Sequence, residues 1–134
     1  MRVYVAASCR RKNEAQMVAD QLSLTGRHLP VSNWHLPSRP PDDDPARWLD
    51  ESEMDYRDIQ RCDAVVCLTG DKDSKGGRHT EFGIGIGLGK HLIILGMPEQ
   101  VFHHFRGVQH APDVGCVIDI LDTLKEYQNE NPRN

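Results

Sequence analysis

The sequence has no uninterrupted apolar run close to the roughly 20 residues that a membrane-spanning helix requires. The opening stretch, residues 1–7, is also too short for a secretory signal, and the basic residues 10–12 follow soon after it. A basic excess is missing as well, because the 134 residues carry a formal net charge of −4 with both signs mixed. These absences argue against a membrane or a nucleic-acid polymer as the main partner, and we expect a soluble, cytoplasmic protein that acts on a small molecule.

The cysteines and histidines form no recognisable metal motif. No CxxC pair occurs among the four cysteines, which are Cys9, Cys62, Cys67 and Cys116. Cys67 lies in an apolar run, where a small buried thiol is ordinary, and we expect reduced core cysteines. His103, His104 and His110 match no zinc-site spacing. The sequence therefore predicts no metal site.

Two glycine-rich segments fall short of nucleotide-binding motifs. Residues 83–89 do not fit G-x-G-x-x-G in any frame, and they precede a strand-like run where the dinucleotide motif should follow one. Residues 70–76 lack the Gly-Lys-Ser/Thr ending of a phosphate-binding Walker loop. Neither a dinucleotide nor any other cofactor is predicted. The alternating glycines instead fit close packing of a helix against a sheet.

What the chain does contain is an alternation of strand-like and helix-like segments. Strands are expected at residues 2–7, 28–31, 64–68, 92–95 and 115–118, and helices at residues 13–25, after residue 44, after residue 77 and at 118–127. The continuous apolar runs are typical of parallel strands covered on both faces. We therefore expect an α/β, flavodoxin-like (Rossmann-like) three-layer sandwich whose five-stranded parallel sheet has the order 2-1-3-4-5. A single domain over residues 1–128 and a frayed polar tail over residues 129–134 complete this prediction.

In this topology the ligand crevice opens at the carboxyl ends of strands 1, 3 and 4. The segments that follow the first and third strands, residues 8–10 and 70–77, are rich in polar residues and glycine. Residues 34–44 fall outside the regular pattern and form a candidate lid that carries Trp34. The aspartates 42–44 within that segment are expected to be solvated.

Glu81 is the candidate chemical centre of the molecule. If the segment after Gly77 is helical, Glu81 lies in its first turn, where unpaired N–H groups and the helix dipole favour negative charge. This placement fits either a held carboxylate or a bound phosphate.

A second carboxylate, Asp55, is expected on the inward face of the helix that Asp44 and Pro45 begin. That face is predicted to consist of Trp48, Ser52, Asp55, Ile59 and Cys62. A carboxylate buried on this face must be compensated by an interaction partner or serve a function. Asp58, by contrast, is expected to face solvent. The alternative is that Asp55 sits at the edge and is hydrated.

Three segments together resemble the nucleoside 2-deoxyribosyltransferase family, and more narrowly its branch of nucleoside 5′-monophosphate N-glycosidases. They are residues 4–10, the pattern Asp55-x3-Ile59-x3-Asp63, and Gly77-x3-Glu81-x-Gly83 with Gly89-Lys90. The similarity covers the chain from Arg2 to about Leu95. It implies cleavage of the N-glycosidic bond of a (deoxy)nucleoside 5′-monophosphate through a covalent glycosyl-glutamate intermediate, or exchange of bases by a transferase. It also implies a homodimer or larger homo-oligomer.

The resemblance assigns roles to individual residues. Glu81 matches the nucleophile, Tyr4 a tyrosine near it, and Asp55 an aspartate that orients the substrate and assists protonation of the leaving base. Ser8 and Arg10 match residues that bind the 5′-phosphate, although Arg10 could equally be part of a solvated basic turn. The other candidate substrate contacts are Ser74, Lys75, Gly77, Arg78, His79 and Trp34, with His79 also a possible acid or base.

One departure from the family leaves the substrate open. Lys75 stands where transferases carry an aspartate and monophosphate hydrolases a serine, so the sequence does not decide between a 5′-hydroxyl and a 5′-phosphate, although a lysine favours an anion. A non-catalytic nucleotide-binding module is the main alternative function. A structural protein whose glycine-rich helix serves only packing is a third.

Overall fold

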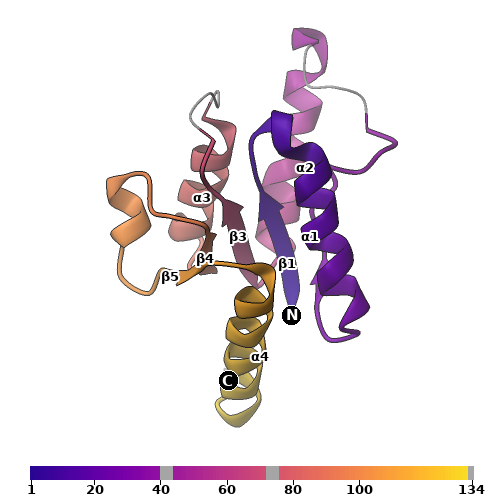
Figure 1. The fold of residues 1–134 in the computed structure, drawn as a ribbon. Coiled ribbons are helices and arrows are strands. Elements are labelled where there is room, and N and C mark those ends of the chain that lie inside the picture. The colour runs from indigo at the N-terminus through magenta and orange to yellow at the C-terminus, as the bar shows by residue number, and fades with distance from the viewer. Residues whose placement is uncertain (40–43, 72–75, 133–134) are drawn as a thin grey trace.

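Five parallel strands form the centre of the fold in a computed structural model, which describes residues 1–39, 44–71 and 76–132 (Figure 1). The strands are β1 (Arg2–Ala6), β2 (Leu29–Pro30), β3 (Ala64–Leu68), β4 (His91–Leu95) and β5 (Gln109–Ala111). Their order, β2-β1-β3-β4-β5, and their parallel pairing confirm the predicted α/β fold. All five residues of β3 are buried, as the continuous apolar run indicated.

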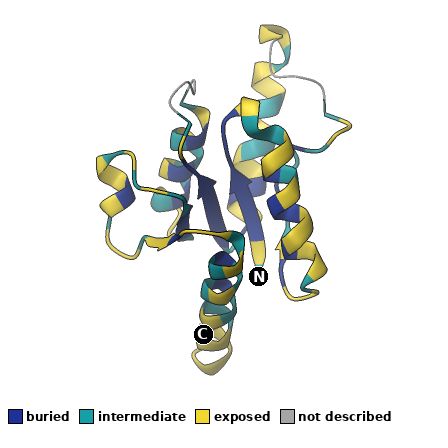
Figure 2. Cartoon of the chain, viewed as in Figure 1, coloured by how far each residue is buried: buried dark blue, intermediate teal, exposed yellow. Residues whose placement is uncertain are grey.

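Helices cover both faces of this sheet. They are α1 (Lys12–Leu24), α2 (Trp48–Arg61), α3 (Gly77–Gly87) and α4 (Val114–Glu130), with short 3-10 helices η1 (Cys9–Arg11), η2 (Pro45–Arg47) and η3 (Val101–His104). Helices α1 and α4 pack on one face and α2 and α3 on the other (Figure 1). Figure 2 shows the buried strands between these layers.

Alternation along β1 decides which side chains face which layer. Val3 and Val5 pack with α1 and α4, whereas Tyr4 and Ala6 pack with α2 and α3. Tyr4 is therefore directed toward the helical layer that carries both candidate carboxylates.

The end of the chain differs from the prediction. Residues 115–118, expected as the fifth strand, belong to α4, and β5 lies earlier, at Gln109–Ala111. Asp113 begins the helix, because its carboxylate accepts a hydrogen bond from the Cys116 N–H at 2.8 Å. Val117 and Leu121 then bury one face of α4. The helix continues to Glu130, so the predicted tail overlaps it.

Within the part of the chain that the structure describes, no helix combines the length and the apolar character needed to cross a membrane.

Candidate active site

Three segments meet at the carboxyl edge of the sheet, where parallel strands commonly present ligand sites. Ser8 and η1 follow β1, residues 69–71 follow β3 and lead toward α3, and Gly96 begins the segment that runs from β4 to η3. The predicted topology placed the first two of these segments at this edge, and the structure agrees.

The Tyr4 phenol lies close to both candidate carboxylates. Its side chain is fully buried, and burial raises the pKa of the phenol well above its usual range. The negative charges of Glu81 and then Asp55 raise this pKa further, and a smaller contribution comes from Asp58. Tyr4 packs between the sheet and helices α2 and α3, the helices that carry Asp55 and Glu81. Because such electrostatic effects fade with distance, both carboxylates lie near the phenol.

The Tyr4 hydroxyl lies beside Glu81 and stays protonated because its pKa is raised. The Glu81 carboxylate raises the pKa of the phenol partly as a hydrogen-bond acceptor, yet the hydroxyl makes no hydrogen bond of ordinary geometry among the described residues. The two groups are thus close without being well aligned.

Glu81 is half-buried and is the fifth residue of α3. The expectation that it occupies the first turn is wrong, because the helix begins at Gly77, directly after Gly76 in the left-handed conformation with φ +88°. Packing of α3 against α2 and the sheet therefore positions Glu81, and the helix N-terminus does not.

Helix α2 buries one more carboxylate than expected. Asp55 is half-buried, but Asp58 is only 1% exposed, which corrects the expectation that it faces solvent. The Asp58 carboxylate accepts hydrogen bonds from Asn33 Nδ2 at 3.0 Å and from the Arg61 guanidinium at 2.6 Å, and these offset the cost of burial. Trp48, expected on the inward face, is half exposed at 50%. The sequence did contain a signal for this burial, because Asp58 follows Asp55 by three residues and so lies next to it on the helix surface.

The two predicted phosphate contacts differ in their surroundings. Ser8 is 7% exposed, and its hydroxyl donates a hydrogen bond to the carboxylate of Asp71. Arg10 is exposed in η1. Its neighbour Arg11 turns inward instead, donating to the Thr69 carbonyl at 2.7 Å.

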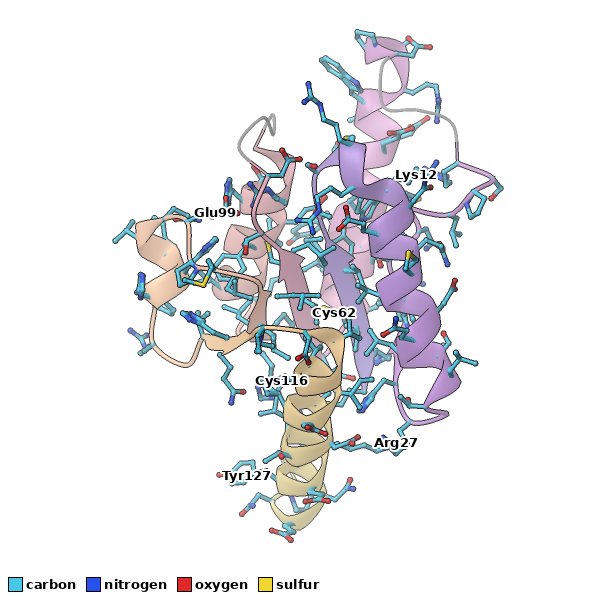
Figure 3. All side chains as sticks on the ribbon, viewed as in Figure 1. Lys12, Arg27, Cys62, Glu99, Cys116 and Tyr127 are labelled. Atoms are coloured by element: carbon cyan, nitrogen blue, oxygen red, sulfur yellow. The ribbon has the colours of Figure 1, made fainter. Side chains whose placement is uncertain are left out.

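Arg78 has a structural partner that the sequence reasoning missed. It is 2% exposed and donates two hydrogen bonds to Glu99, at 2.9 and 2.8 Å. Glu99, labelled in Figure 3, comes from the segment between β4 and η3. Burial alone would raise the pKa of Glu99, but hydrogen bonds from Arg78 and the Gly70 N–H hold it below its usual value. Arg78 thus joins the segments that follow β3 and β4, and its contact with a substrate stays a prediction.

His79 projects from a different side of α3 than Glu81 does, away from Tyr4 and Asp55. Its ring packs on His103 with centroids 5.6 Å apart, and Gln100 lies beside it, 3.5 Å between Nε2 and the His79 Nδ1. Two residues along a helix correspond to about 200°, so His79 and Glu81 project from different sides of α3. Burial and then Arg78 lower the pKa of His79. This position does not favour contact with a sugar held at Glu81, or the proposed acid or base role there.

Trp34, the aromatic residue of the expected lid, is anchored to the sheet. Its indole Nε1 donates to the Val5 carbonyl at 2.7 Å, and the Val5 N–H donates to Ser32 Oγ at 3.1 Å. Because β2 contains only Leu29–Pro30, these side chains continue the pairing along the edge of β1. The rest of the expected lid includes residues 40–43, which lie outside the described residues.

Ser74 and Lys75 also lie outside the described residues, and Gly77 is exposed at the start of α3. In the described part of the chain, no group of three or more His, Cys, Asp or Glu side chains is arranged to hold a metal ion. Cys62 and Cys67 are buried as expected, whereas Cys9 is exposed.

Two solved structures have a similar fold. The CMP N-glycosidase BcmB of Clostridium botulinum shares 20% sequence identity with a TM-score of 0.59, over 92% of this chain and 99% of that chain. The 2-deoxyribosyltransferase of the psychrotolerant bacterium Bacillus psychrosaccharolyticus shares 16% identity with a TM-score of 0.65, over 87% of this chain and 90% of that chain. No family model and no curated protein matches the sequence. At these identities the likeness establishes the shared α/β fold.

Proposed function

We propose that this chain cleaves the N-glycosidic bond of a (deoxy)nucleoside 5′-monophosphate through a covalent intermediate on Glu81. The observation that carries the proposal is the grouping of the buried Tyr4 phenol with the carboxylates of Glu81 and Asp55. Two carboxylates that flank a sugar can divide the work of nucleophile and acid, as in retaining glycosidases. The fold likeness to an N-glycosidase and a deoxyribosyltransferase supports the same chemistry.

In the first step a Glu81 oxygen attacks the anomeric carbon of the sugar. The bond from this carbon to the base nitrogen breaks, and its electron pair leaves with the base. Asp55 acts as the general acid and passes a proton to the departing base. The Tyr4 hydroxyl stays protonated because its pKa is raised, and it donates a hydrogen bond to Glu81 once the bound substrate aligns the two groups.

In the second step water attacks the anomeric carbon of the glycosyl ester. The bond to the Glu81 oxygen breaks and restores the carboxylate, while the proton of the water passes to Asp55. Two displacements at one carbon give net retention of configuration. If a second base enters in place of water, the same intermediate gives transfer, which is the activity named for one of the two structural neighbours.

The phosphate is assigned to the segment after β1. Ser8 and Arg10 lie there, at the edge where the first turn of α3 also begins. A hydroxyl donor, a guanidinium and a helix N-terminus are each suited to an anion.

The proposal is tested by incubating the protein with nucleoside 5′-monophosphates and nucleosides and measuring the free base by chromatography. We expect release from at least one nucleotide and, for Glu81→Gln, a loss of at least about 1,000-fold in kcat/KM. Glu126→Gln, which removes an exposed carboxylate on α4, is the control and should keep full activity.

Two results would contradict the proposal. Folded wild-type protein that releases no base from any of these compounds would favour a non-catalytic nucleotide-binding module. Release that persists unchanged in Glu81→Gln would exclude the covalent mechanism.

A further inference from the structure

The hydroxyl of Ser8 is already used within the protein. Ser8 is 7% exposed, and its Oγ donates to a carboxylate oxygen of Asp71, which follows β3. A serine hydroxyl has a single proton to donate. A hydroxyl that donates to Asp71 therefore cannot donate to a substrate phosphate at the same time.

The main chain of Asp71 is held in place beside Ser8. A guanidinium nitrogen of Arg78 donates to the Asp71 carbonyl at 2.6 Å, while the charge of Arg78 is directed at the carboxylate of Glu99. Glu99 in turn accepts a hydrogen bond from the Gly70 N–H. This network links the segments after β3 and β4 and fixes the backbone that presents the Asp71 side chain to Ser8.

We infer that Asp71 is a specificity-determining residue, whose carboxylate competes with the 5′-phosphate of the substrate for the Ser8 hydroxyl. The inference rests on the assignment of Ser8 under the proposed function. A phosphate must replace the Asp71 carboxylate at Ser8 and also meets its negative charge, and like charges at close range weaken binding. A sugar with a neutral 5′-hydroxyl meets neither obstacle, because it leaves the Ser8 to Asp71 hydrogen bond intact.

The competition is measured by calorimetric titration of the full chain with ribose 5-phosphate and, separately, with ribose. We expect Asp71→Asn to bind ribose 5-phosphate about tenfold more tightly than wild type, because the charge is lost. Asp71→Ala should bind it at least as tightly, because the Ser8 proton is also released. The affinity for ribose should stay unchanged.

Two further variants identify the cause of the gain. Asp119→Asn, on the exposed side of α4, changes the net charge equally and should leave both affinities unchanged. Adding Ser8→Ala to Asp71→Ala should remove the part of the gain that comes from the released Ser8 proton and leave the part that comes from the lost charge. Thermal unfolding of each variant checks that it is folded, and Asp71→Asn keeps nearly the shape of the native side chain.

The inference is overturned if neither Asp71 variant binds ribose 5-phosphate more tightly than wild type does, or if Asp119→Asn gives an equal gain. Weaker binding in the Asp71 variants would show that the carboxylate supports Ser8 and does not compete with the phosphate. These outcomes are distinct from failure of the proposed function, since absence of base release from any nucleotide would refute catalysis and leave the binding result standing.

Discussion

The chemistry of the Tyr4 phenol depends on its neighbours. Its hydroxyl is buried beside Glu81 and makes no hydrogen bond of ordinary geometry among the described residues. Removing the hydroxyl therefore breaks no such bond and should change the stability of the fold little. We expect Tyr4→Phe to change the free energy of unfolding by no more than about 1 kcal/mol. Its kcat/KM for base release should fall about 10- to 100-fold, because the donor that orients Glu81 is gone. Equal activity in Tyr4→Phe and wild type would remove Tyr4 from the mechanism.

The raised pKa of Tyr4 also predicts how stability depends on alkaline pH. Above the ordinary phenol value of about 10, the unfolded chain loses a proton that folded Tyr4 retains, so the unfolded state binds fewer protons. The contribution that the Tyr4 phenol makes to the free energy of unfolding is thus fully present below about pH 10. It is lost as the pH rises through the higher pKa of the folded state. Denaturant unfolding at pH 9 and pH 11 should show that the free energy of unfolding falls more between these pH values for wild type than for Tyr4→Phe. Parallel losses in both proteins would contradict this prediction.

Helix α2 is joined to the segment after β2 through Asp58. We expect Asp58→Ala to lower the free energy of unfolding by about 1–3 kcal/mol, because Asn33 loses a hydrogen-bond acceptor inside the protein. The Arg61 contact contributes less than its short distance suggests, since solvent screens the Arg61 side chain, which is 62% exposed. Urea denaturation measures the change, and Glu53→Ala, at an exposed position of the same helix, should stay within about 0.5 kcal/mol of wild type. Equal stability of the two variants would show that Asp58 does not anchor α2.

Assembly of the folded chain remains a prediction, which the resemblance supplied and the structure of one chain leaves untested. The outer side of α2 exposes large apolar side chains that fit such an interface, Trp48 at 50%, Leu49 at 68% and Tyr56 at 42%. We expect light scattering coupled to size-exclusion chromatography to give at least twice the mass of one 15.2 kDa chain. A monomer at the concentrations used for assay would contradict the expectation.

The fold was predictable because its signals are local. Residues 64–68 and 92–95 are apolar without interruption, which is typical of parallel strands covered on both faces. The fifth strand was misplaced because residues 115–118 resemble a short strand in isolation. The Asp113 cap and the burial of Val117 and Leu121 make the segment helical.

The sequence alone determined the alternation of strands and helices, from which the flavodoxin-like sheet order was expected, and its resemblance to a known family supplied the candidate grouping of Tyr4, Asp55 and Glu81. Only the tertiary structure decided that Arg78 is bound to Glu99, that Asp58 is buried, and that Ser8 donates to Asp71. The physical reason is that local periodicity governs which backbone conformation a segment adopts, whereas the state of a polar side chain depends on partners brought to it from elsewhere in the chain. Asp71 is 63 positions from Ser8, and no pattern along the sequence connects them.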